Sequence, residues 1–225
     1  SLHAPTLTKP PTQHEMAAVH DLHRAVAQSS TGGADYSPSQ QLDVVSTHTH
    51  SNSLVVFPES RNVHGKTFGG FVCSQAFDLA YFAAASFAGG APVASLGLDE
   101  AIFLQPVGIG DHISIKARVA HSDPATGVFR VSVNVDVLDP RHKRVDHRGA
   151  DGTTATRRTN FLRFAFAAAP GRVAALLPQT YVEILGYVNA ARRAAVERPS
   201  EATFRDLEAF FADKKNNAHP HAQDV

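Results

Sequence analysis

The chain has 225 residues, enough for one ordinary domain with extensions or for two small domains. Lysine plus arginine and aspartate plus glutamate both number 21, so the formal net charge is zero. This balance argues against nucleic acid or an anionic membrane as the main partner, because both attract a basic surplus. Cys73 is the one cysteine, which excludes an internal disulfide and a zinc site built on several cysteines. No apolar run approaches the roughly 20 residues of a membrane span, and we expect any secretory signal to be absent or already removed.

Residues 1–41 are predicted to be a linker-like segment with one helix. Met16, Val19 and Val26 recur at helical spacing within residues 14–27, just after a proline-rich start. Residues 29–40 contain two glycines and a proline, which indicate a loop. Short β-rich runs follow at 42–45 and 54–57.

The most informative stretch is an apolar run at residues 71–88. It is rich in alanine and phenylalanine, follows a glycine-bearing loop at 61–70, and ends at Gly89, Gly90 and Pro92. These signals predict one helix. A helix that is apolar nearly all round is buried on nearly all sides, so we expect other elements to wrap it.

Four strands are predicted after this helix, at 93–104, 111–120, 128–138 and 154–166. Residues 128–137 alternate between apolar and polar side chains, which is typical of a sheet with one packed face. The segment 139–152 is long and charged and predicts a mobile hairpin tip. One buried helix with four consecutive strands indicates an α+β domain, most simply an antiparallel sheet curled around the helix.

We place that domain at residues 42–168 and a C-terminal helical extension at 169–225. Residues 181–195 and 203–213 are expected to form helices, and Arg192 and Arg193 on the first one are interpreted as part of a solvated face. His14 and His20 do not have the His-Glu-x-x-His zinc spacing. The histidine pairs 48/50 and 219/221 could chelate a metal adventitiously, and we interpret both as flexible tail chemistry.

The sequence Asn62-Val63-His64-Gly65-Lys66-Thr67-Phe68-Gly69-Gly70-Phe71 resembles the hot-dog-fold acyl-CoA thioesterases. The resemblance extends over Asp99–Asp111, the alternating segment 128–137 and residues 159–164. It is greatest to the C-terminal half of the two-domain mitochondrial members. The helix near residues 14–26 is similar to their interdomain linker, and the stretch from Pro178 onwards to their C-terminal tail.

This resemblance implies a hot-dog fold, in which a sheet wraps one central helix and the active site lies between two such units. It implies hydrolysis of acyl-CoA to free acid and coenzyme A, with no metal and no cofactor beyond the coenzyme A of the substrate. The implied partners are a second copy of the chain, in a homodimer or higher homo-oligomer, or an N-terminal hot-dog half. The implied location is mitochondrial, with the cytoplasm as the alternative.

Catalytic roles follow from the chemistry of the loop and helix. The Gly70 and Phe71 amides at the helix start can stabilise an oxyanion, although a glycine pair there also suits a tight turn. Asn62 can hold the water or the thioester carbonyl, or else form the turn. Asp78 is the one ionisable residue of the predicted helix, where a buried carboxylate is costly. We predict that it acts as the general base or as the nucleophile. The alternative role is structural, with the carboxylate hydrogen-bonded to neighbouring side chains.

The position of Asp78 departs from the pattern of many hot-dog enzymes. Those enzymes place the acid seven residues after the glycine pair, where this chain has Phe77. One residue turns a helical side chain by about 100°. Asp78 is therefore expected either to point somewhat differently or to serve structure.

Five further residues are predicted to bind the substrate without taking part in the reaction. They are His64 and Gly69 in the loop, Ser74 on the Asp78 face of the helix, and Arg157 and Arg158 for the phosphates of coenzyme A. Alternative functions remain open. The chain could be a non-catalytic half that binds acyl-CoA or completes a partner, or a hydratase, which the lack of a well-placed helix histidine disfavours.

Overall fold

A computed structural model describes residues 10–29, 42–44, 48–146, 149–196 and 199–217. Its elements in chain order are α1 (Gln13–Ser29), β1 (Leu42–Val44), β2 (Thr49–Val55), a short 3-10 helix η3 (Pro58–Ser60), α2 (Gly69–Phe87), β3 (Val93–Phe103), β4 (His112–Asp123), β5 (Val128–Asp146), β6 (Gly149–Ala168), β7 (Ala175–Leu177), α3 (Tyr181–Val196) and α4 (Glu201–Asn217). The loop was predicted at 29–40; Ser29 instead ends α1, and residues 30–40 lie outside the described residues. The predicted domain boundaries stay predictions.

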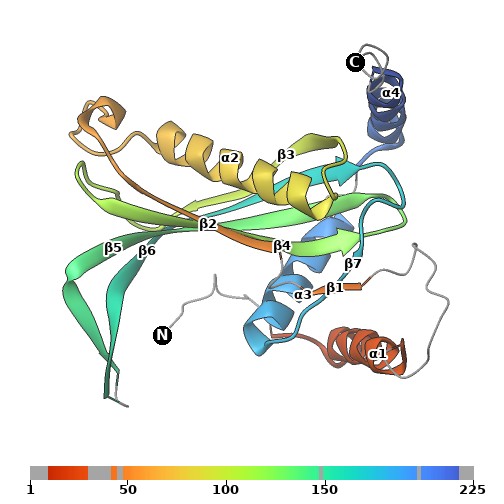
Figure 1. Ribbon diagram of the computed structural model, residues 1–225, viewed down its shortest axis with the longest axis horizontal. Helices are drawn as coiled ribbons and strands as arrows, with labels where there is room; N and C mark the ends of the chain where they lie inside the picture. The colour runs from red at the N-terminus through yellow and green to blue at the C-terminus, as the bar shows by residue number, and fades with distance from the viewer. Residues whose placement is uncertain (1–9, 30–41, 45–47, 147–148, 197–198, 218–225) are drawn as a thin grey trace, which may run out of the picture.

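A five-stranded antiparallel sheet in the order β2-β4-β5-β6-β3 carries α2 on one face (Figure 1). Valines of β5 and phenylalanines of β6 alternate toward α2 and form the core with its buried alanines. The α+β prediction is confirmed. The sequence analysis missed most of β2. The side chains of this strand are largely exposed, so apolar and polar residues do not alternate clearly along it.

The central helix begins two residues before the predicted start and ends near the predicted stop. Ala88 follows it, and the Gly90 amide donates to the Ala85 carbonyl while Gly90 has φ of 76°. This left-handed end is the termination that the glycine pair predicted.

Burial of α2 on nearly all sides is wrong for the single chain. One stripe of the helix is exposed to solvent, with Tyr81 at 42% and Phe82 at 59% of their surface accessible. The sheet covers the alanine-rich opposite side. An apolar helix composition therefore indicated a covered surface, but the described part of this chain leaves much of that stripe open to solvent.

Strands β5 and β6 extend far beyond the predicted ends and form an arm that projects from the body (Figure 1). Their pairing continues to Asp146 opposite Gly149, with register shifts after Asp139. The charged segment interpreted as a loop is therefore mostly strand, and the tip at 147–148 lies outside the described residues. Strands pair through backbone hydrogen bonds, which need no apolar side chains. The apolar pattern of the sequence therefore did not predict the outer parts of β5 and β6.

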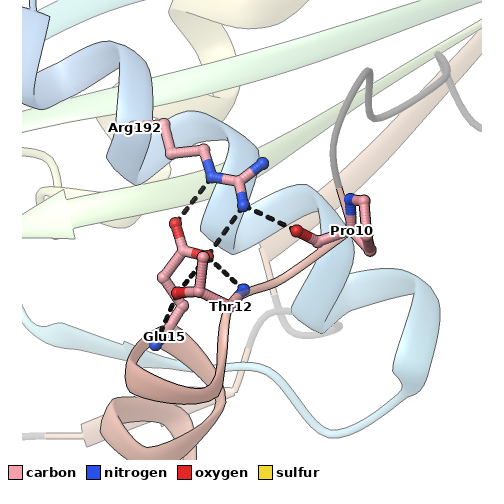
Figure 2. Close-up of polar contacts among 4 residues, drawn as sticks. All are labelled: Pro10, Thr12, Glu15 and Arg192. Carbon is pink, nitrogen blue, oxygen red and sulfur yellow. Dashed lines mark hydrogen bonds and ion pairs between the residues drawn. The ribbon is translucent and has the colours of Figure 1, made fainter.

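Helix α3 packs on the sheet face opposite α2 and also anchors α1. Figure 2 shows Arg192 of α3 donating to both carboxylate oxygens of Glu15, at 2.6 and 2.7 Å, and to the Pro10 carbonyl. Thr12 and Glu15 also cap α1 reciprocally. Arg193 forms an ion pair with Glu100 of β3 at 2.6 Å. The interpretation of both arginines as a solvated face is wrong.

Candidate active site

A pocket of about 210 Å³ opens where β3 leaves the sheet, beside the first turn of α2. Its walls are mainly apolar and come from the loop before α2, the first turn of α2, the segment after β3 and β6. The lining residues are Thr67, Gly69, Val72, Phe103, Leu104, Gln105, Pro106, Val107 and Asn160. An apolar pocket with a few polar groups at a helix N-terminus is suited to a ligand with an apolar end and a carbonyl.

The loop before α2 is held rigidly at the pocket rim. The Thr67 amide donates to the Val107 carbonyl at 3.0 Å, and Lys66 pairs with Gly108 in an isolated bridge. These bonds fix the loop to the segment that follows β3. The glycine-bearing loop is thereby positioned as one wall of the pocket, as its place before the helix suggested.

The two glycines at the start of α2 lie close to aromatic rings. A Cβ at residue 70 would lie 2.3 Å from the ring of Phe68, and one at residue 69 would lie 3.3 Å from the ring of Phe103. The Phe71 amide donates to the Phe68 carbonyl at 3.0 Å. Of the two amides predicted to bind an oxyanion, that of Gly70 is therefore the better candidate.

Asn62 organises the loop through its side chain. Its Oδ1 accepts from the backbone amides of His64 and Lys66, at 2.9 and 3.0 Å. The backbone amide of Asn62 donates to the Lys66 carbonyl. This is the turn-forming role that we considered as the alternative. A water-binding or carbonyl-binding role would fall to the side-chain amide group.

Asp78 is exposed on the uncovered stripe of α2, and Ser74 one turn earlier is exposed beside it. The expected cost of burying this carboxylate does not arise in the single chain. Among the hydrogen bonds of the described residues, none joins Asp78 to Ser74 or Gln75. The alternative of a structural carboxylate bonded within its own helix therefore gains no support.

Gly70 and Asp78 cannot act on one carbonyl within a single unit. Eight residues of helix at 1.5 Å each separate them by about 12 Å along the axis. A general base has to come within about 3 Å of the proton that it takes. An amide of one unit and a carboxylate of another could meet at one site, which is the arrangement implied by the resemblance.

The remaining predicted substrate residues lie outside the pocket lining, except Gly69. His64 is exposed in the loop. Arg157 lies over the segment after β3, where it donates to the Gln105 side chain at 2.6 Å. Arg158 is half-buried and bonds Asp136 and Asn134 of β5, so its guanidinium is committed to the sheet.

Asn160 of β6 is a site residue that sequence reasoning missed. It lies opposite Val135 and Phe103 in the sheet and is 2% exposed. Period-two alternation places it on the same face as the core residues Leu162 and Phe164. A polar residue at that point of an apolar series was the signal that could have found it.

Three further observations concern the cysteine, metal-binding residues and helix length. Burial raises the pKa of the Cys73 thiol, and this side chain packs against the core, as expected for a structural cysteine. In the part of the chain that the structure describes, no three histidine, cysteine, aspartate or glutamate residues gather as a metal site. No helix of those same residues is long and apolar enough to cross a bilayer.

Comparison with known proteins identifies acyl-CoA thioesterases in several organisms. The chain is 42% identical over 92 residues to acyl-coenzyme A thioesterase 2, chloroplastic, of Humulus lupulus, which covers 40% of this chain and 21% of that protein. It is 26% identical over 183 residues to acyl-coenzyme A thioesterase 9, mitochondrial, of Mus musculus, covering 81% of this chain and 38% of that protein. The matched region is thus well under half of either relative. No family model matches the chain.

Solved structures show the same fold. An acyl-CoA hydrolase of Staphylococcus aureus, determined with butyryl coenzyme A and coenzyme A, superposes with a TM-score of 0.59 at 23% identity, covering 79% of this chain and 99% of that one. The acyl-CoA hydrolase of Bacillus cereus gives a TM-score of 0.58 at 20% identity, covering 76% and 96%. The predicted resemblance is confirmed: the chain has the hot-dog fold and is similar in sequence to acyl-CoA thioesterases.

Proposed function

We propose that the chain is a hot-dog unit of an acyl-CoA thioesterase, which hydrolyses acyl-CoA to a free acid and coenzyme A. The pocket beside the glycine-opened start of α2 is the observation that carries this proposal. It offers an apolar wall for an acyl group next to helix amides that can stabilise a developing oxyanion. The sequence similarity to acyl-CoA thioesterases supports the substrate class.

In this mechanism the thioester carbonyl lies against the Gly70 amide, which stabilises the negative charge of the tetrahedral intermediate. Asp78 of a second unit removes a proton from the attacking water, and the coenzyme A thiolate leaves. Asn62 holds the loop and offers its amide group to the water or the carbonyl. A direct attack by Asp78 on the carbonyl is the alternative and gives an anhydride intermediate.

The assembly in the proposal is a homodimer or a higher homo-oligomer of the chain, or a pair with an N-terminal hot-dog half. The exposed stripe of α2, β3 and the residue after β3 support a second unit, because several large apolar side chains there face solvent. They are Tyr81, Phe82, Leu98, Phe103 and Leu104, each at least 42% exposed. A patch of this kind marks an interface.

Arg157 is the residue we assign to the phosphates of coenzyme A, since it is exposed near the pocket rim and its guanidinium is a good phosphate ligand. Arg158 contributes indirectly by holding β5 and β6 together. No further cofactor is part of the proposal. The mitochondrial location is proposed from the names of the mouse relatives, and fractionation of cells that express the full-length protein tests it against the cytoplasm.

Thiol release from acyl-CoAs of increasing chain length by the purified chain tests the activity. Hydrolysis, together with a dimer or larger species by light scattering, is the expected result. A folded, self-associated protein that binds acyl-CoA but releases no thiol would contradict the catalytic proposal. That outcome would favour the second candidate, a non-catalytic half, for which the engagement of Asn62 Oδ1 in its own loop is the favouring observation.

A further inference from the structure

The pocket beside the start of α2 has an open side and a closed side. Phe103 and Leu104 line it and are each 56% exposed, so they mark its mouth. Val72 and Val107 also line it, but they are only 2% and 5% exposed and belong to the core under α2. These two valines form the floor of the pocket. The pocket therefore leads inward from solvent and ends against the packed core.

The floor is held in place by the chain itself. The Val107 carbonyl accepts from the Thr67 amide at 3.0 Å, and the Gly108 amide donates to Asp111 Oδ2 at 2.7 Å. Protein cores contain few voids as large as a water molecule, and an extra methylene forced into them displaces side chains and backbone. A second unit placed over the mouth can cover the pocket, but it does not move the floor. The depth of the pocket is thus a property of this chain.

We propose that the pocket holds the acyl chain and limits it to about eight carbons, so that short-chain and medium-chain acyl-CoAs are the substrates. This inference rests on the proposed function and deepens it. A cavity of roughly 150 Å³ binds benzene, which has six carbons, and by proportion the volume of about 210 Å³ holds about eight. The Gly70 amide assigned to the thioester carbonyl lies next to Gly69, which lines the pocket, so the acyl chain can enter from the carbonyl.

The mainly apolar lining gives this proposal a measurable signature. Each methylene group that leaves water for an apolar site should tighten binding by about fourfold. The gain ends once the pocket is full, because further carbons stay in solvent or disturb the core. If the pantetheine arm occupied the pocket instead, the affinity would not depend on the length of the acyl chain.

The experiment measures the affinity of non-hydrolysable thioethers, from S-ethyl-CoA to S-dodecyl-CoA, by titration calorimetry on the unaltered chain. We expect an increase of about fourfold for each methylene group up to S-octyl-CoA, followed by a constant or falling affinity. A continued increase to S-dodecyl-CoA, a maximum already at S-butyl-CoA, an affinity independent of chain length, or no binding of S-octyl-CoA would each overturn the proposal.

A change in the floor should move the limit. Val107→Ala removes both γ-methyl groups from the lining, and cavities of this kind collapse only in part, so the maximum should shift by about two carbons to S-decyl-CoA. Val93→Ala is the matched control, because Val93 is also 5% exposed and packs in the same core but lies outside the pocket lining. Its maximum should stay at S-octyl-CoA. An unshifted maximum in folded Val107→Ala, or an equal shift in Val93→Ala, would overturn the proposal.

Thermal unfolding shows whether both variants are folded, and the series on the unaltered chain decides the question if either is not. Thiol release from octanoyl-CoA is measured separately. Binding that is strongest at S-octyl-CoA without thiol release would contradict the proposed catalysis and leave the chain-length inference standing. Thiol release together with an affinity that still increases at S-dodecyl-CoA would do the reverse.

Discussion

Buried polar side chains on the two faces of the sheet differ in whether an opposite charge lies beside them. On the face under α2, Asn160 is buried at the pocket without a partner for its Oδ1. On the other face, Arg130 and Arg163 are equally buried but each faces a carboxylate, Asp99 at 2.8 Å and Glu100 at 3.1 Å. Arg193 reaches the same Glu100 from α3.

The difference suggests which residues contribute to the stability of the fold. The ion pairs of Arg130, Arg163 and Arg193 hold β3, β5, β6 and α3 together. Asp99 and Glu100 lie in the stretch that resembles the thioesterases, yet their contacts are structural. Substitution of the exposed polar residues in the N-terminal half of α2 should therefore change activity, and substitution of the ion-paired residues on the other face should change stability.

The largest effect is expected for Asp78→Asn. Loss of the general base should lower the rate of thiol release by roughly 10²- to 10⁴-fold, since that is the usual contribution of general base catalysis. The thermal unfolding temperature should not change, because Asp78 is exposed in the chain. Rates from a thiol-release assay and unfolding by calorimetry check the two halves of the prediction.

Ser86→Ala is the matched control for Asp78, since Ser86 is exposed two helical turns further along α2. It should retain the rate of the unaltered chain. Unchanged turnover in Asp78→Asn would remove this carboxylate from the mechanism. A large loss of stability would instead show that Asp78 holds the fold or the two units together.

Glu100→Ala tests the opposite face. It leaves the guanidinium of Arg163, which is 2% exposed, without its carboxylate, and breaking such a pair costs about 3 kcal/mol. We expect that loss in the free energy of unfolding measured with urea, and an unchanged rate per folded molecule. The exposed Glu208→Ala on α4 should change stability little.

A second variant identifies the cause of that loss. Adding Arg163→Met to Glu100→Ala removes the unpaired charge and should recover part of the stability. No recovery would mean that Glu100 acts through Arg193 or through packing. Either variant that lost activity per folded molecule would break the separation between the two faces.

The sequence predicted those parts of the molecule that depend on local pattern. The apolar run and its glycine ends located α2, and the alternation at 128–137 located the centre of β5. The loop and helix residues were recognised through their resemblance to a family. What the sequence missed depends on contacts far along the chain: the pairing of β1 with β7, the outer parts of β5 and β6, and the ion pairs of Arg192 and Arg193.

The site shows the same division. Asp78 and Asn62 were identified in the sequence by their residue types. The exposure of Asp78 and the hydrogen bonds of Asn62 within its loop were not predictable, because they follow from the tertiary structure. Asn160 did not stand out, because its neighbours in sequence are an ordinary strand. Its meaning depends on which face of the sheet it occupies and on a pocket formed by residues some 50 to 90 positions away.

The smallest effect concerns the attachment of α1 to α3. Hydrogen bonds from Arg192 and from the Thr12 amide lower the pKa of Glu15 from 4.5 to about 2. Because the pKa of the folded state is depressed, the contribution of this pair to docking is complete above pH 4.5 and is lost as the pH falls toward 2. Hydrogen exchange should therefore show α1 losing protection over this range while the amides of α2 stay protected.

Glu15→Gln should abolish that pH dependence and leave α1 weakly protected at every pH, since a neutral amide cannot form the bidentate pair with Arg192. Asp21→Asn is the control, because Asp21 pairs with Arg24 within the same helix and is exposed to solvent. It should follow the unaltered chain. If α1 instead lost protection together with α2 in all three proteins, the acid transition would be global unfolding, and the Glu15 contact would not govern the attachment of this helix.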